Sequence, residues 1–61
     1  MFIIYRGYND GSDTITEQGD SIDLIFGACA SYVMDPALTD LVVFNKTTGA
    51  VIINYHVPKG S

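Results

Sequence analysis

Residues 21–34 decide which fold class this chain can adopt. Their apolar side chains recur at helical spacing and form one stripe, made of Ile22, Ile25, Phe26, Cys29 and Val33. Asp20 or Ser21 can serve as the N-cap, and Asp23 lies in the first turn, where the helix dipole favours an anion. Asp35 precedes Pro36 and therefore avoids helical geometry. We predict a helix over residues 21–34.

The same segment has an alternative interpretation as a strand over residues 21–26. Ile22, Leu24 and Phe26 alternate there, directly after a turn signal at Gly19 and Asp20. A strand at this place would make the chain an all-β module, part of a larger assembly. Alanines follow at positions 28 and 30, and alanine is a poor strand former, so the pattern favours the helix. Far-ultraviolet circular dichroism separates the two interpretations.

The C-terminal third of the chain has the clearest pattern, that of a β-hairpin. Strand-like runs at residues 41–45 and 50–57 flank a short turn at 46–49 that ends in Gly49, and Pro58 ends the second run. A further strand is predicted at residues 2–8, followed by the turn cluster 9–12. We expect the polar segment 13–20 to be an exposed connection, with at most a short extended piece at 14–16.

The order strand, helix, strand, strand predicts a single domain over residues 1–61 with a two-layer α+β fold. The simplest arrangement is a three-stranded antiparallel sheet covered on one face by the helix. Residues 50–57 form its central strand, between residues 2–8 and 41–45. This arrangement makes the hairpin partner run opposite to both of its neighbours.

One helix covers only one face of a sheet, and side chains alternate between the two faces. We expect these residues to face the helix: Ile3, Tyr5, Val42, Phe44, Val51, Ile53, Tyr55 and Val57. The open face then carries an apolar patch of Ile4, Leu41, Val43 and Ile52. At its other end lie Arg6, Tyr8, Asn54 and His56. Because contiguous exposed apolar patches mark interfaces, we expect a homodimer that forms through this open face.

The size of the chain supports self-association. A 61-residue domain buries a small share of its surface and is marginally stable alone. Its single cysteine, Cys29, excludes an internal disulfide, and one His with one Cys cannot complete a structural zinc site. We expect no metal and no cofactor. Cys29 falls in the middle of the predicted helix on its apolar stripe and is interpreted as a core residue.

Charge excludes several classes of partner. The net charge is −4, and the only bases are Arg6, Lys46 and Lys59, which argues against binding to nucleic acid or to an anionic membrane. The acidic segment 10–23 suits a protein with a basic surface. No apolar run reaches the length of a membrane span, and the N-terminus lacks a signal-peptide pattern. We expect a cytoplasmic protein.

Two functional hypotheses follow. The first is a non-enzymatic intracellular protein-interaction module, homodimeric and acting as a regulatory accessory protein. The second is a small-ligand or anion-binding protein that uses Arg6, Tyr8, Asn54 and His56. His56 is the only histidine of the chain, and no nucleophile or carboxylate near it in sequence completes a catalytic set. The oxygen-rich segment that begins at Asn9 does not fit a calcium-binding EF-hand loop.

Overall fold

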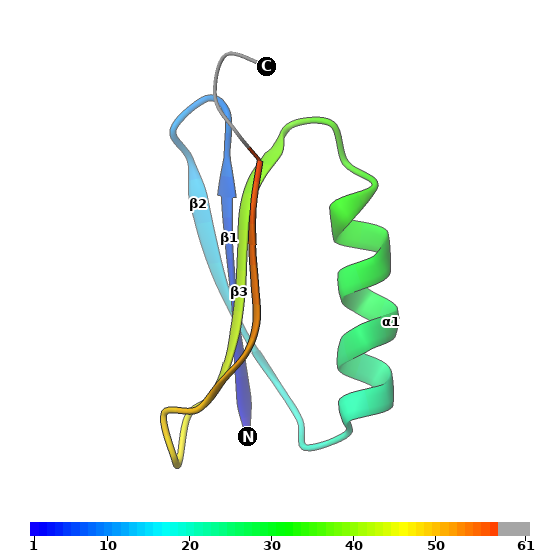
Figure 1. Cartoon of the computed structure of the whole chain (residues 1–61), viewed down its shortest axis with the longest axis vertical. Helices are drawn as coiled ribbons and strands as arrows, with labels where there is room; N and C mark the ends of the chain where they lie inside the picture. Colours follow the sequence, from blue (N-terminus) through cyan, green and yellow to red (C-terminus); the bar gives the residue numbers. More distant parts are fainter. Residues whose placement is uncertain (58–61) are drawn as a thin grey trace.

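The computed structural model describes residues 1–57, which form two layers, a sheet and one helix (Figure 1). The elements are β1 (Phe2–Tyr8), β2 (Asp13–Gln18), α1 (Ile22–Val33), β3 (Leu38–Asn45) and β4 (Val51–His56). The predicted helix is confirmed within one residue at each end, so the strand interpretation of residues 21–26 is wrong. The strand end expected at Pro58 lies outside the described residues.

The sheet has four strands in the order β2-β1-β3-β4, and every neighbouring pair is antiparallel. The α+β class with one helix and an antiparallel sheet is confirmed, but the three-stranded sheet is wrong. The missing strand is β2, which pairs with β1 from Gln18 opposite Phe2 to Asp13 opposite Gly7. Its composition is typical of a loop, yet an edge strand needs only backbone pairing, and its threonines are β-branched.

The additional strand changes the connection made by the helix. The turn after β1 reverses the chain, with Gly11 at φ 88° and the Tyr8 amide donating to the Ser12 carbonyl at 2.9 Å. The helix therefore links β2 to β3, which run in the same direction on either side of β1. β3 takes the position beside β1, so β4 lies at the edge and the expected central position of residues 50–57 is wrong.

The hydrophobic core lies between α1 and the two central strands. Its cluster consists of Phe2, Ile4, Ile25, Cys29, Leu38, Leu41 and Val43. Register brings these side chains together, because Ile4 lies opposite Val43 and β3 begins at Leu38, three residues earlier than expected. Ser21 caps the helix by accepting a hydrogen bond from the Leu24 amide at 3.4 Å.

The predicted orientation of the sheet is wrong for its central strands. Ile4, Leu41 and Val43 are fully buried beneath the helix, and they do not lie on an open face. Their neighbours in sequence occupy the other face, where Ile3 lies opposite Phe44 and Tyr5 opposite Val42. Both alternating sets are apolar, so alternation defined the two sets without indicating which of them meets the helix.

The edge strand β4 keeps part of the predicted orientation because of a β-bulge. The pairing with β3 shifts between Val43 opposite Ile53 and Phe44 opposite Val51, which leaves Ile52 as the extra residue. Ile53 therefore lies on the helix side, where it packs against the core, whereas Val51 shares the other face with Phe44. One inserted residue separates two side chains that strict alternation places together.

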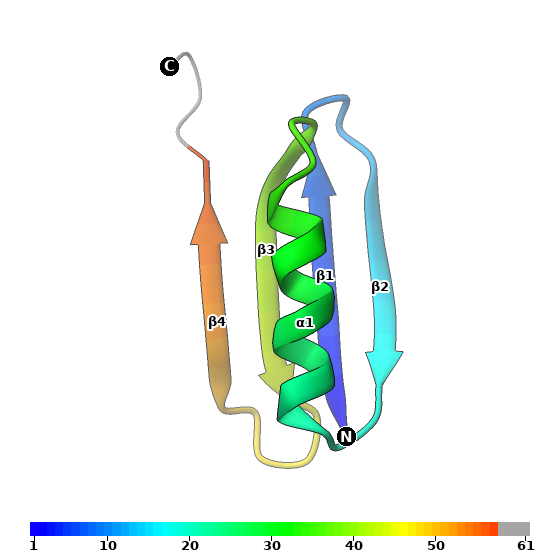
Figure 2. The ribbon, with the colours of Figure 1, turned by 90° about the vertical axis from the view of Figure 1, so that its right-hand side faces the viewer.

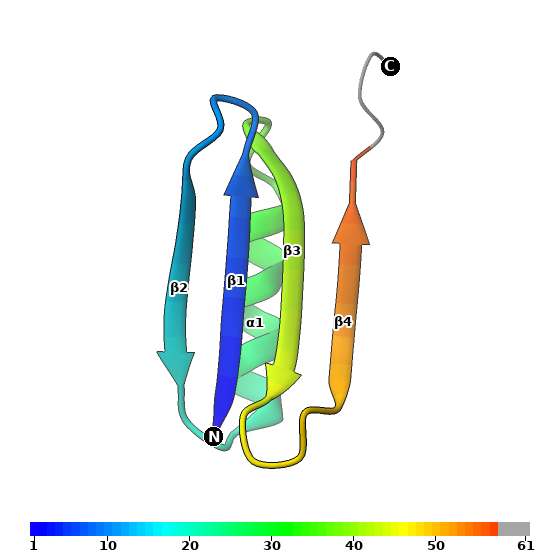
Figure 3. The same ribbon diagram turned by 90° about the vertical axis from the view of Figure 1, so that its left-hand side faces the viewer.

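The helix is narrower than the sheet that it covers. It lies over β1 and β3 and leaves both edge strands beyond its width (Figure 2). On the opposite side, the described residues place no second layer over the sheet (Figure 3). The fold therefore leaves three regions accessible: the open sheet face, the β2 edge and the β4 edge.

Candidate interaction surface

The four polar residues expected at one site lie on two different faces. Arg6 and Tyr8 alternate with Ile4 along β1 and lie on the helix side, where Tyr8 packs against the core. His56 lies opposite Asp40, which lies opposite Gly7, so it occupies the open face together with Asn54. The sheet separates the two pairs, and a single ligand site cannot use all four.

Arg6 forms a polar cluster under the side of the helix. Its guanidinium lies 4.2 Å from the centroid of the Tyr32 ring, in a cation–π contact. It donates to the Tyr8 hydroxyl at 3.2 Å and to Thr16 Oγ1 at 3.3 Å. Its Nε is buried and has no acceptor within the described residues. The cluster joins β1, β2 and α1, and it holds a positive charge without a carboxylate among residues 1–57.

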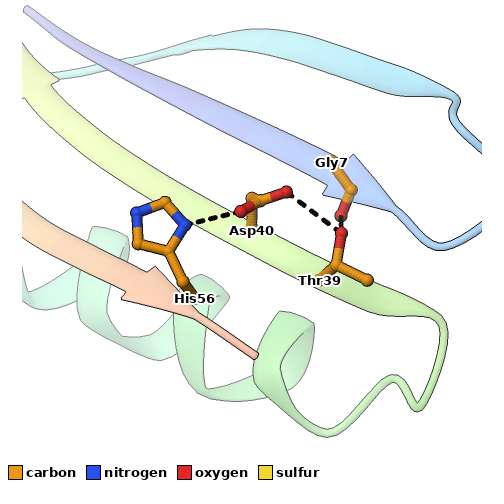
Figure 4. A network of polar contacts seen from close by, with 4 residues as sticks. All are labelled: Gly7, Thr39, Asp40 and His56. Carbon is orange, nitrogen blue, oxygen red and sulfur yellow. Dashed lines mark hydrogen bonds and ion pairs between the residues drawn. The ribbon is translucent and has the colours of Figure 1, made fainter. Parts of the chain in front are cut away.

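His56 and Asp40 form an ion pair across β3 and β4 on the open face (Figure 4). His56 Nδ1 lies 2.5 Å from Asp40 Oδ1. The Thr39 hydroxyl lies 3.1 Å from Asp40 Oδ2 and 3.2 Å from the Gly7 carbonyl oxygen. Gly7 leaves the room for this carboxylate, because a Cβ at that position would meet Asp40 Oδ2 at 3.0 Å.

The Asp40–His56 pair joins the side chains of β3 and β4. The Thr39 hydroxyl contacts Asp40, and no hydrogen bond found within residues 1–57 joins it to the imidazole. The sequence interpretation missed Asp40 because it began the strand at residue 41. Counting outward from the turn at 46–49 places Asp40 opposite Tyr55, and only the bulge at Ile52 brings His56 to that position, so the hairpin pattern did not reveal this pair.

Cys29 is a core residue, as predicted. It is buried in the cluster beneath the helix, and this burial raises the pKa of its thiol. The thiol therefore stays protonated and poorly nucleophilic at neutral pH. Among the residues that the structure describes, no group of three or more His, Cys, Asp and Glu side chains is arranged to hold a metal ion. Within residues 1–57, no helix combines the length and the apolar character that crossing a membrane requires.

A set of exposed apolar side chains gathers where α1 faces β4. Tyr55 lies opposite Leu41 on the helix side of the sheet, and Val57 follows two residues later on the same side. Three exposed residues of α1 lie on the flank next to its buried Ile25–Cys29 stripe: Ile22, Phe26 and Val33. Because the helix is right-handed, this flank is the one on the β4 side. We call these five residues, Ile22, Phe26, Val33, Tyr55 and Val57, the β4 surface.

The open sheet face is less exposed at its centre than the β4 surface. Ile3 is buried there, and Tyr5, Val42 and Phe44 are half-buried. Every residue of the β4 surface is instead exposed, from 36% at Val57 to 50% at Phe26. The residues of the β4 surface are therefore more accessible than the apolar residues at the centre of the open face.

Comparison of the chain with known proteins found no match. No family model matches it, no curated protein matches it, and no solved structure matches it. The functional conclusion consequently depends on the surfaces described above.

Proposed function

We propose that this chain is a non-enzymatic protein-interaction module that acts as a homodimer. One observation carries the proposal: the five apolar side chains of the β4 surface are all exposed, and they lie along one side of the fold. A monomeric protein rarely exposes contiguous apolar surface of this kind without a partner. Three residues of the patch predicted from the sequence, Ile4, Leu41 and Val43, are core residues, whereas Ile52 is exposed at the bulge. The exposed residues of the β4 surface take the place of this patch in the proposal.

Stability provides the second support. The core is a single layer between one helix and two strands, and a domain of this size is marginally stable. Self-association stabilises the folded state by mass action, because the dimer binds folded chains only. The exposed apolar residues then contribute to folding instead of exposing the chain to aggregation.

The acidic residues supply a surface for a different partner. Five carboxylates occupy the segment that runs through the first turn, β2 and the start of α1: Asp10, Asp13, Glu17, Asp20 and Asp23. Asp10, Asp13 and Glu17 lie on β2 or in the turn before it, at the edge of the sheet opposite to β4. We propose that this side binds a protein with a basic surface in the cytoplasm, as a regulatory accessory protein does, while the β4 side holds the homodimer.

Sedimentation velocity tests the proposal on the wild-type chain at concentrations from about 1 µM to about 300 µM, a range that spans ordinary protein–protein affinities. We expect a mass that rises to twice 6.6 kDa. A single species of 6.6 kDa at every concentration would contradict the homodimer. Ile4→Lys is unsuitable as a control because Ile4 is fully buried, so Phe26→Lys is the appropriate surface variant.

The Arg6 cluster favours a second candidate function, binding of a small anion. Its guanidinium has a buried Nε without an acceptor, and hydroxyls of Tyr8 and Thr16 lie beside it. Titration of inorganic phosphate into the wild type, followed by NMR chemical shifts of β1 and β2, tests this candidate. Saturable shifts that disappear in Arg6→Gln would support an anion site. Equal shifts in both proteins would exclude it.

A further inference from the structure

We infer that a second copy of this chain pairs antiparallel with the outer edge of β4, centred on Tyr55, and extends the sheet across both copies. The inference rests on the proposed homodimer and specifies its interface. It follows from the backbone of β4, from the register that the bulge allows, and from the absence of charge along this edge.

The backbone of β4 supplies unpaired hydrogen-bonding groups in a regular order. The Val57 amide donates to the Thr39 carbonyl at 2.8 Å, so the backbone groups of Val57 point toward β3. Because these groups alternate along an antiparallel strand, Tyr55 and Ile53 also point inward. The amides and carbonyls of Asn54 and His56 point outward, where the described residues provide no strand to receive them.

The bulge selects the register. Ile52 interrupts the regular strand, so an incoming strand can pair without distortion only along residues 53–57. An antiparallel pair of identical strands over this stretch is centred on its middle residue, Tyr55. Asn54 then exchanges backbone bonds with His56 of the second copy, and His56 with Asn54 of the second copy. The regular half of β4 is therefore complementary to itself.

In this register, the side chains that lie opposite each other are compatible on both faces of the sheet. On the helix side, Tyr55 lies opposite Tyr55 of the second copy, and Ile53 lies opposite Val57 of the second copy. Aromatic and aliphatic cross-strand pairs of this kind are stabilising. On the open face, the Asn54 amide lies opposite the imidazole of His56 of the second copy, so polar groups meet polar groups. Each side chain stays on the face of the sheet that it occupies in the single chain.

The helix flank completes the buried area. A specific interface buries about 800 Å² on each partner, which is more than one edge strand provides. The two-fold axis of this pairing is perpendicular to the sheet, so both helices lie on the same side. Ile22, Phe26 and Val33 of each copy then border a shared apolar floor that contains Ile53, Tyr55 and Val57. The β4 surfaces of the two copies then become continuous.

Charge favours pairing between the β4 edges of two copies over pairing between their β2 edges. Residues 47–57 contain no Asp, Glu, Lys or Arg, so two chains of net charge −4 can approach here without direct repulsion. The β2 edge carries Asp13 and Glu17, and pairing two β2 strands would bring like charges together. A chain with these two edges pairs through β4.

Cysteine cross-linking tests the register in a Cys29→Ala background. Tyr55→Cys creates a non-hydrogen-bonded pair with Cα atoms about 4.5 Å apart, which lies within the range that a disulfide spans. We expect mild oxidation to yield a covalent dimer at a rate at least about tenfold above that of Asn54→Cys and of Ile15→Cys on β2. Equal rates in the three variants, or faster linkage through Asn54 or Ile15, would overturn the inference.

A second variant separates failure of the interface from failure of the dimer. Asn54→Pro removes one outward amide of β4 and leaves the inward bonds to β3 intact. We expect circular dichroism to report a folded chain and sedimentation to report a dissociation constant raised at least about thirtyfold. A folded variant that dimerises as tightly as the wild type would refute the β4 interface while the homodimer stands. A wild type that stays monomeric would refute both.

Discussion

The two edge strands of this sheet have the same length and the same kind of pairing, but their side chains differ in charge and polarity. β2 and β4 have six residues each and pair with a central strand along their length. β2 carries Asp13 and Glu17, and Lys46 reaches Glu17 from the β3–β4 turn at 3.0 Å. Among its side chains only Ile15 is a large hydrophobic. β4 instead contains no Asp, Glu, Lys or Arg, and its residues are aliphatic or aromatic apart from Asn54 and His56.

This difference shows how a small domain directs its own association. Charged side chains on an edge strand prevent pairing with other chains, and β2 follows this rule. An apolar uncharged edge is an aggregation hazard unless one specific partner covers it. The bulge at Ile52 reduces the hazard at β4, because it limits regular pairing to a short stretch with one preferred centre. The same device limits aggregation and specifies the dimer.

The largest effect is expected from a substitution in the hydrophobic core, on which both edge strands depend. Leu41→Ala empties a fully buried position in β3, opposite Arg6 of β1 and Tyr55 of β4. We expect a loss of about 2–5 kcal/mol in the free energy of unfolding, because transfer and cavity terms add. Urea denaturation followed by far-ultraviolet circular dichroism measures it. Dimerisation adds stability by mass action, so a higher protein concentration should partly restore the folded state.

Val42→Ala is the matched control in the next position of the same strand. Val42 is half-buried on the open face, so the truncation removes less buried surface and leaves no closed cavity. We expect it to cost about 1 kcal/mol. Equal losses in the two variants would mean that the helix side of the sheet is not the core.

Adding a charge to each edge in turn tests the comparison directly. Tyr55→Lys places a cation at the proposed centre of the dimer, whereas Ile15→Lys places one on the β2 edge, where Ile15 is already 69% exposed. We expect the dimer dissociation constant to rise about a hundredfold in Tyr55→Lys, which corresponds to about 2.8 kcal/mol. Ile15→Lys should change it by less than about threefold. Sedimentation equilibrium measures both.

A reversed order would contradict the assignment of roles to the two edges. If Ile15→Lys dissociates the dimer and Tyr55→Lys does not, the open sheet face or the β2 edge is the interface. Circular dichroism of both variants is required, so that weaker association is not confused with unfolding.

Local patterns of the sequence predicted the helix and the hairpin correctly, and for a clear physical reason. The stripe through Ile25 and Cys29, the Ser21 cap and the Gly49 turn are local features, and each acts within a few residues. The prediction was wrong at β2 because this strand depends on a partner distant in sequence. Its pairing with β1 depends on backbone hydrogen bonds, which leave little record in a polar sequence such as that of Asp13–Gln18.

The candidate site was harder to predict because it depends on the order of the strands. Missing β2 reversed the direction of the chain that enters the helix, and this error placed β4 in the centre and inverted the central faces. Arg6 and His56 then appeared as neighbours, although the sheet separates them. The bulge at Ile52 depends on the folded register and left no signal in the alternation pattern.

A smaller effect is expected at the pair that attaches β4 to β3. His56→Ala removes the contact with Asp40, and both side chains are substantially exposed, at 58% and 40%. Exposed ion pairs contribute little, so we expect a loss below about 1 kcal/mol in the free energy of unfolding. The dimer should persist, because His56 contributes its backbone to the proposed pairing. Thermal denaturation and sedimentation measure the two quantities.

The same variant tests the alternative role of His56. A ligand site that depends on the imidazole would lose its binding in His56→Ala while the fold remains intact. Asn54→Ala, on the same face of β4, is the matched control. Loss of the dimer in His56→Ala but not in Asn54→Ala would indicate that the imidazole has a direct role in assembly.

The smallest effect is expected at the turn that leads into β2. The Ser12 hydroxyl and then the Ser12 amide donate to the Asp10 carboxylate, and these bonds lower the pKa of Asp10 below its ordinary 3.8. A lowered folded-state pKa stabilises the fold above the unfolded value, and this contribution is lost as the pH falls through the folded value. Asp10→Asn should therefore be less stable than the wild type at pH 7, with a difference that shrinks below about pH 4. Urea titrations at pH 7 and pH 3 measure it. Because β2 depends on this turn, while β4 depends on the turn at Gly49, the dimer dissociation constant at pH 7 should be unchanged by Asp10→Asn. A change there would mean that the two edges are coupled and that β2 contributes to the interface.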